Sequence, residues 1–517
     1  MEPVSTALPP PTDLAAPRVV AMSGSYRCIL HATSLLGGAA AANVLIGMVR
    51  SKFVAVLLGP AGVGMIGIYQ SITGLVSTVA CCGLNYSAVR ELSEASAAGD
   101  EDRVKEAVRT FRSLSLCLGI GGTLVMAIFA WPLSVLMFQN GTEAVALAWL
   151  SFTIGGTLVS NYYTALIQRS QQIAALARMN VLGSLLGSIV SVSCFALWHR
   201  QGVIPALLAG TLIQVTLAWW YSRSARFRAT GGLTAPDPVI SGKLLRVGSM
   251  MMLLGILSSI VMFIQRLMLL QWSGEADVGV FQSALSLSGM YAGYILGAMG
   301  TDFLPRLSAV TSEPETMNRL VNEQTRVALL LGLPGIAVTI TLAPLIIPLF
   351  YSQQFSGAVP VLQWMAMGVF GRLVSWPLGF VLIAMGRMRE GALADIFGHV
   401  INLAVTALLF SWFGVVATGL AAIAMYLGYS FVVRWLVGRL TGFVWSREVC
   451  ETIFLGFVTL IGTLLSASFL PFYAHLVVAG LVTLVTGLIC LQQLAHVAGV
   501  TQVGVLGALN RWRGKSS

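Results

Sequence analysis

The chain has 517 residues, of which 56% are hydrophobic and only 10% are charged, and its mean hydropathy is +0.84. Soluble domains cannot bury so much apolar surface, so the composition excludes a string of soluble domains. The net charge of +10 comes from basic residues spread over many short segments, which argues against nucleic acid as a partner. The seven cysteines contain no Cys-x-x-Cys pair, so we expect neither a metal site nor a disulfide framework.

The first 25 residues are rich in proline and lack the pattern of a signal peptide, so we expect a disordered cytoplasmic tail at 1–25. Beyond this tail, apolar stretches follow one another to about Val500, each long enough to cross a bilayer. About fourteen spans are predicted. They lie at residues 28–58, 61–88, 111–138, 143–168, 175–198, 202–222, 245–273, 278–304, 327–351, 357–385, 390–412, 415–437, 449–470 and 474–496.

The distribution of Lys and Arg predicts the orientation of the spans. Every second connecting segment carries basic residues, whereas the alternate segments contain only Arg200 between them. The positive-inside rule therefore places the basic segments and both chain ends in the cytoplasm. Two of the basic segments are predicted to form surface helices, at 101–112 and 313–326.

An internal repeat relates the two halves of the chain. Identical residues recur at an offset of 215, the separation of Gly59 from Gly274 and of Gly64 from Gly279. Both copies begin with a span that enters from the cytoplasm, so the repeat is parallel, with a substrate path expected between the halves. The predicted fold is an all-α polytopic membrane protein. It has an N-terminal six-helix lobe at 26–228, a cytoplasmic linker at 229–243, a C-terminal six-helix lobe at 244–440, two additional transmembrane helices at 441–500 and a basic cytoplasmic tail at 501–517.

Four cations lie inside the predicted spans, namely Arg50, Lys52, Arg266 and Arg372. A charge at the bilayer centre costs about 2.5 to 3.5 kcal/mol on insertion scales, so such residues usually face a water-filled interior. The alternative is that Arg50, Lys52 and Arg266 extend to the outer interface, which lies near them. Position 266 matches position 51 in the repeat, so the halves carry cations at equivalent depth and are expected to present them to one central cavity. Such groups bind phosphate oxygens, and the predicted substrate is an anion such as a phosphate or pyrophosphate.

Asp302, Asp395 and His399 are candidates for ion coupling. A carboxylate near a histidine can relay protons or hold a cation, although interfacial salt bridges are the alternative interpretation. No catalytic residue, metal ligand set or cofactor is predicted, apart from coupling to H+ or Na+.

Several segments resemble a known family. They are the run from Lys52 to Gly64, Val278 to Gln282, Phe303 to Ser308, and Gly379-Phe380 after Arg372. Together they resemble the Wzx-type lipid-linked oligosaccharide flippases, which include common antigen and O-antigen translocases, within the multidrug/oligosaccharidyl-lipid/polysaccharide exporter superfamily.

The resemblance implies a V-shaped pair of pseudo-symmetric six-helix lobes in the bacterial inner membrane. It also implies movement of undecaprenyl-pyrophosphate-linked oligosaccharides from the cytoplasmic to the periplasmic leaflet, for surface polysaccharide synthesis, with polymerase and chain-length proteins as partners. By the same resemblance Lys52, Arg266 and Arg372 take a headgroup-binding role, and Asp395 matches the family carboxylate of the eleventh span. The family stops near twelve spans, so the C-terminal pair and the Pro-rich N-terminus are departures.

Three alternatives stay open at this level. A cation-coupled drug or metabolite antiporter of the same superfamily would require carboxylates in the lobes and a less cationic cavity. A polysaccharide polymerase or ligase would need a sizeable outer loop with acid and base residues, whereas the outer segments hold at most Glu275 and Asp277 as carboxylates. A structural scaffold would not need cations in matched spans. The sequence therefore favours a transporter over an enzyme.

Overall fold

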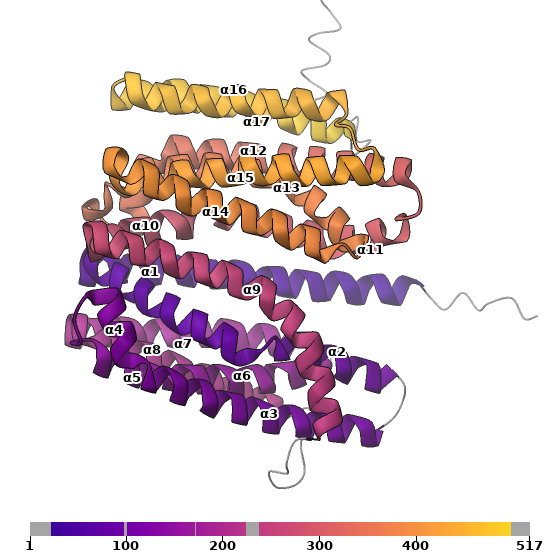
Figure 1. Ribbon diagram of the computed structural model, residues 1–517. Coiled ribbons are helices and arrows are strands. Elements are labelled where there is room, and N and C mark those ends of the chain that lie inside the picture. Colours follow the sequence, from indigo (N-terminus) through magenta and orange to yellow (C-terminus); the bar gives the residue numbers. More distant parts are fainter. Residues whose placement is uncertain (1–21, 98–100, 171, 224–236, 498–517) are drawn as a thin grey trace, which may run out of the picture.

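The computed structural model describes residues 22–97, 101–170, 172–223 and 237–497, and within these ranges it contains helices joined by short connections and no strand (Figure 1). This confirms the predicted all-α fold. The N-terminal half comprises α1 (Met22–Cys81), α2 (Leu84–Ala97), α3 (Glu101–Ile128), α4 (Ala130–Phe138), α5 (Ala144–Leu150), α6 (Phe152–Arg169), α7 (Ile173–Trp198) and α8 (Val203–Ser222). The C-terminal half comprises α9 (Pro238–Ser273), α10 (Glu275–Ser288), α11 (Met290–Ala309), α12 (Pro314–Phe350), α13 (Ala358–Ala384), α14 (Met388–Phe413) and α15 (Ala417–Thr441). The chain continues with α16 (Arg447–Phe469) and α17 (Phe472–Val497).

Ten helical segments of the described chain are long and apolar enough to cross a membrane. Three of them, at 37–81, 173–222 and 388–441, are 45, 50 and 54 residues long. Since about 20 residues cross a bilayer, each of these three has the length of two passages. The expected span at 278–304 differs, because it is divided between α10 and α11 at Gly289 and does not belong to the ten. Glycine lowers helix stability, which accounts for a break at this position.

The predicted surface helices at 101–112 and 313–326 are not separate elements. They form the first turns of α3 and α12, which run on into the apolar part of each helix. Neither segment has a Gly or Pro between its polar turns and the start of the apolar stretch, so nothing ends the helix there. Both segments are thus helical, as expected, but as the beginnings of longer helices.

Parts of the predicted domain plan lie outside the described residues. These are 1–21 of the N-terminal tail, 229–236 of the linker and the whole C-terminal tail at 501–517. The last part of the expected linker is helical, because α9 begins at Pro238. Proline is well suited to the first turn of a helix, where its missing N–H has no partner to lose.

The backbone breaks in the same way at two positions that the repeat relates. Gly59 interrupts α1 with φ 65° and ψ −172°, and Gly274 separates α9 from α10 with φ 88° and ψ −178°. Side chains other than glycine are strained at such positive φ values. The offset of 215 found in the sequence thus recurs in the local backbone geometry.

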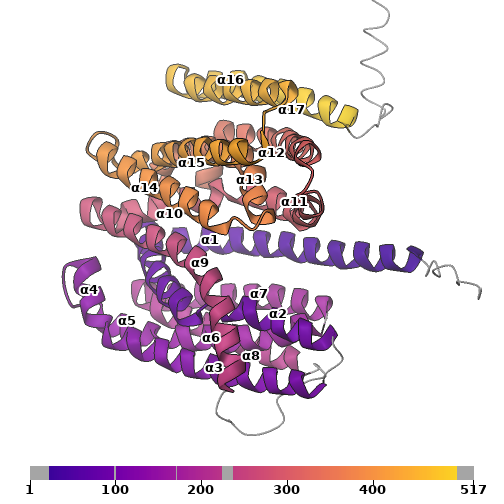
Figure 2. The ribbon, with the colours of Figure 1, turned by 45° about the vertical axis from the view of Figure 1, so that its right-hand side comes forward.

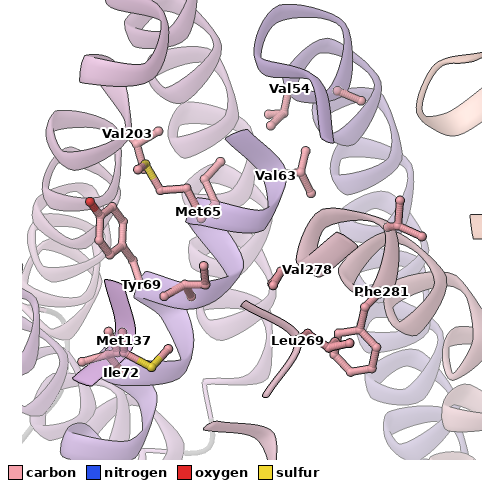
Figure 3. Packing of buried hydrophobic residues seen from close by; sticks show 14 of the residues in the cluster. Val54, Val63, Met65, Tyr69, Ile72, Met137, Val203, Leu269, Val278 and Phe281 are labelled. Atoms are coloured by element: carbon pink, nitrogen blue, oxygen red, sulfur yellow. The ribbon is translucent and has the colours of Figure 1, made fainter. Parts of the chain in front are cut away.

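The two halves meet in a shared hydrophobic core, part of which Figure 3 shows. Val63 of α1 and Val278 of α10, which are equivalent in the repeat, face one another in this view. The next pair, Gly64 and Gly279, lies closer still. A Cβ on Gly64 would lie 1.9 Å from the carbonyl oxygen of Glu275, and a Cβ on Gly279 would lie 1.9 Å from that of Pro60. Pro60 and Glu275 are themselves equivalent, so the contact has the form of a two-fold interface.

Helix α9 connects the two halves at the opposite end. Its first part crosses to α2 and α3 (Figures 1 and 2), where Leu244 is buried in one cluster with Leu84 and Phe111. Gly83 and Gly248 allow this approach, because a Cβ on Gly83 would lie 1.9 Å from the carbonyl oxygen of Gly248. Helices α16 and α17 lie beyond α12, on the side away from the N-terminal half (Figure 1).

Candidate functional site

A polar cavity of about 730 Å³ lies inside the N-terminal half, between α1, α6, α7 and α8. Its lining includes Arg50 together with the amide side chains of Asn43, Asn161, Asn180 and Gln214. We call it the amide cavity. The structure therefore places Arg50 in the interior of one half.

A second cavity, of about 390 Å³, lies inside the C-terminal half between α13, α14 and α15. Arg372, Asp395 and His399 line it, together with Tyr426 and Tyr429. We call it the charged cavity. A Cβ on Gly379 would lie 2.8 Å from the hydroxyl oxygen of Tyr429. The glycine therefore leaves the space that this hydroxyl group occupies.

Asp395 and His399 are one turn apart on α14, and the structure brings both to the cavity that holds Arg372. The Nδ1 atom of His399 is buried and has no hydrogen-bond partner among the described residues. Asp302 is elsewhere. It lies on the exposed face of α11 and forms an ion pair of 3.1 Å with Arg306. An i, i+4 pair of this kind is the interfacial arrangement that the sequence left open as the alternative.

Arg266 is buried where α9 meets α1 and α10, with only 6% of its surface exposed. It donates hydrogen bonds to Oε1 of Gln282 at 2.6 Å and to the carbonyl oxygen of Met262 at 3.3 Å, and its Nε has no partner among the described residues. Gly67 of α1 lies against this pair, since a Cβ there would be 3.2 Å from Oε1 of Gln282 and in ordinary contact, at 3.5 Å, with Nε of Arg266. Gly67 and Gln282 are equivalent in the repeat, so Arg266 lies close to the axis that relates the halves.

Lys52 points in another direction. Its Nζ donates a hydrogen bond of 2.7 Å to the carbonyl oxygen of Pro348, in the last turn of α12. Carbonyls in the last turn of a helix lack partners within the helix and attract cations. In this structure Lys52 therefore joins the two halves.

A third cavity, of about 280 Å³, lies between the halves and is bounded by α1, α10, α11 and α12. Asn43, Ser51, Ser286, Tyr294 and Tyr351 contribute its polar surface, and its described lining contains no charged side chain. The four predicted cations are thus found in four different surroundings. Asn43 lines both this inter-half cavity and the amide cavity, so the two share a wall.

Sequence reasoning missed the amide side chains, because it searched the spans only for charges. A signal was present. Asn161, Thr164 and Gln168 follow the i, i+3, i+7 spacing of one helix face, and Asn180 and Ser184 follow the i, i+4 spacing of another. A polar stripe within an apolar helix predicts a polar interior, even where no residue is charged.

Comparison with known proteins places this geometry in context. A family model described as "Polysaccharide biosynthesis protein" matches residues 53–360. Proteins named Lipid III flippase from Escherichia coli (strain K12) and Shigella flexneri are each 21% identical to this chain over 388 residues, which cover 74% of this chain and 92% of theirs.

Solved structures share the fold. The Lipid II flippase MurJ in an inward closed conformation has a TM-score of 0.69 at 12% identity, covering 89% of this chain and 99% of that one. An inward-facing MATE family transporter of the MOP superfamily has a TM-score of 0.66 at 18% identity, covering 77% and 96%. These names are those of flippases and transporters, in agreement with the expectation of a transporter and not an enzyme.

The matching family model runs from the middle of α1 to the start of α13 and so includes the break at Gly59, the part of α1 that follows it, and α10, which meets α1 in the shared core. It covers more than half of the 517 residues. The chain is a multi-pass membrane protein that belongs to the family of polysaccharide biosynthesis proteins.

Proposed function

We propose that this protein is a flippase for lipid-linked oligosaccharides in the bacterial inner membrane. It takes an undecaprenyl-pyrophosphate-linked unit from the cytoplasmic leaflet to the periplasmic leaflet by alternating access, with both chain ends in the cytoplasm. The product would pass to a polymerase and chain-length proteins for surface polysaccharide synthesis. The names of the Lipid III and Lipid II flippases among its relatives support this substrate class.

The unneutralised positive charge inside the membrane helices carries the proposal. Arg50, Lys52, Arg266 and Arg372 form no ion pair with a carboxylate anywhere in the described part of the chain. Charges inside a bilayer are costly unless a partner or water compensates them. A pyrophosphate group supplies oxygens that suit both guanidinium and ammonium donors. The substrate headgroup is then the missing counter-charge, reached as the halves change their relative arrangement.

A leaflet-accessibility assay tests this proposal. Purified protein in liposomes, with labelled polyprenyl-pyrophosphate saccharides in one leaflet, should transfer the label to the other leaflet. Losing a charge-assisted hydrogen bond of about 1.5 to 3 kcal/mol predicts that Arg372→Glu and Arg266→Glu lower the rate by at least roughly tenfold. Arg319→Glu is the control, because Arg319 lies on the polar first turns of α12 with its side chain 74% exposed. Transfer at the wild-type rate by well-inserted Arg266 and Arg372 variants would sink the headgroup assignment.

Coupling to an ion gradient is assigned to Asp395 and His399 of the charged cavity. Asp395→Asn keeps the shape of the side chain and removes its negative charge. We expect this variant to lose the acceleration that an imposed H+ or Na+ gradient gives to transfer, while binding of the glycolipid persists. Asp302→Asn on exposed α11 is the matched control and should keep the acceleration. If Asp395→Asn still responds to both gradients, coupling does not pass through this carboxylate.

A further inference from the structure

The amide cavity and the charged cavity occupy equivalent places in the two halves. Adding the offset of 215 to most residues that line the first gives a residue that lines the second. Residues that show this are Asn43 and Ser258, Thr157 and Arg372, Asn161 and Trp376, Asn180 and Asp395, Ser184 and His399, and Gln214 and Tyr429. The two halves therefore contain equivalent cavities. The residues that differ between them make one cavity rich in amides and the other charged.

The same packing detail supports the equivalence. A Cβ on Gly183 of α7 would lie 2.5 Å from Oε1 of Gln214 on α8. Its counterpart Gly398 of α14 packs less tightly against the equivalent residue, since an added Cβ would lie 3.4 Å from the Cβ of Tyr429 on α15. In each half a glycine of one helix therefore lies against a cavity-lining residue of the next helix.

The amide cavity contains polar groups that lack partners. The amide side chains that line it form no side-chain hydrogen bond within the described part of the chain; they are Asn43, Gln70, Asn161, Gln168, Asn180 and Gln214. Asn43 Oδ1 is buried and has no hydrogen-bond partner among the residues that the structure describes. Asn161 lies eight residues before Arg169 at the end of α6, roughly 12 Å along the helix. Polar groups at such depth need a partner, which a dry apolar bundle does not provide.

The chemistry of the lining selects the ligand. An amide offers a donor and an acceptor side by side, and each sugar hydroxyl is likewise both donor and acceptor. The described lining contains no carboxylate, and its cation, Arg50, lies two turns from Asn43 on the same face of α1. A volume of about 730 Å³ lies in the range of about 300 to 1,000 Å³ usual for ligand pockets.

We propose that the amide cavity binds the saccharide part of the transported glycolipid, with Arg50 directed to the phosphate that joins it to the lipid. This inference rests on the proposed flippase function and deepens it. The inter-half cavity adjoins the amide cavity at Asn43, so the saccharide would enter past this side chain. The two equivalent cavities thus differ in chemistry: the amide cavity combines amide side chains with one cation, Arg50, whereas the charged cavity combines Arg372 with Asp395 and His399.

Native mass spectrometry of the purified full chain tests the inference with two probes. One is the extract of polyprenyl-pyrophosphate-linked saccharides from the bacterium that makes the chain, in which the mass identifies the bound species. The other is undecaprenyl pyrophosphate without sugar. Asn161→Leu and Gln214→Leu preserve side-chain size and remove the amide. Each should weaken binding of the saccharide-bearing lipid by roughly three- to tenfold while leaving the sugar-free lipid unaffected.

Thr216→Val provides the control, because Thr216 lies on the exposed face of α8 outside the cavity. The melting temperature separates recognition from a structural role, since replacing an unpartnered amide should leave it unchanged or higher. Unchanged binding of the saccharide-bearing lipid, or an equal loss for both probes, overturns the saccharide assignment. A folded wild-type chain that binds neither probe overturns the proposed function, and this inference with it.

Discussion

Single glycines determine how closely the two halves approach. Gly64 and Gly279 are equivalent in the repeat and lie in backbone contact across the shared core. Gly64 faces the carbonyl oxygen of Glu275, and Gly279 faces that of Pro60, which is equivalent to Glu275 in the repeat. Backbone atoms cannot turn aside as a flexible side chain can, so this contact tolerates no Cβ on either side.

Gly64→Ala and Gly279→Ala should therefore force the halves apart at this contact. We expect either variant to insert into the membrane and to lose transfer of the glycolipid, because the arrangement in which the halves meet here is no longer accessible. Gly121→Ala is the matched control in α3, where an added Cβ would meet nothing within 4 Å. The liposome transfer assay measures the outcome, and wild-type rates for both interface variants would show that the contact is not required.

At the scale of elements, polar contacts join the two halves at one end of the molecule. This is the end where the helices break at Gly59 and Gly274. Arg200, in the turn between α7 and α8, pairs with Glu275 at the start of α10 at 2.8 Å. Gln271 donates a hydrogen bond of 3.0 Å to the carbonyl oxygen of Leu136, and Lys52 reaches Pro348. The carboxylate of Glu275 also lies favourably in the first turn of its helix. These contacts close the end that the positive-inside rule places outside.

Breaking the pair between Arg200 and Glu275 should favour opening at that end. The pair is 58% and 20% exposed, so its contribution is of the order of 0.2 to 1 kcal/mol, a shift of up to about fivefold. Arg200→Glu should increase labelling of a cysteine introduced at Ser286, in the inter-half cavity, by an impermeant maleimide added outside. The experiment uses a chain whose native cysteines are replaced.

The swap of Arg200→Glu with Glu275→Arg should restore labelling to the starting level, since it reforms the pair in reverse. Labelling that is unaffected by the single change, or that the swap fails to restore, would contradict the role of this ion pair in closure.

At the scale of the whole molecule, α16 and α17 form an addition to the repeat. They pack on α12 and α13 through Leu460 and Cys490, and Thr341 hydrogen-bonds Thr483 at 3.1 Å. Arg326 pairs with Glu448 at the start of α16. None of the three cavities described above is lined by a residue of these two helices.

A chain that ends after Ser446 should therefore insert and retain measurable transfer. Lipid tails can cover the apolar face of α12 almost as well as α16 and α17 do, and the hydrogen bonds lost are worth only about 0.6 kcal/mol each in a membrane. The liposome assay, with insertion confirmed, gives the residual rate. Complete loss from a well-inserted truncation would mean that the pair belongs to the transport machinery.

Some of this could be predicted from the sequence by itself. Apolar runs fixed the membrane class, and the offset of 215 predicted that Gly59 and Gly274 occupy matching places, because both signals are local or depend only on matched residues. The sequence likewise identified Arg372, Asp395 and His399 as unusual within spans, and the structure brings these three to one cavity.

Only the tertiary structure decided which way the polar side chains face. Arg50 and Lys52 are two residues apart, yet one lines the amide cavity and the other reaches Pro348, since side chains two positions apart point to different sides of a helix. The surroundings on each side depend on distant helices, which hydropathy does not specify. The amide cavity has the same cause, because Asn161, Asn180 and Gln214 converge only when α6, α7 and α8 pack around α1.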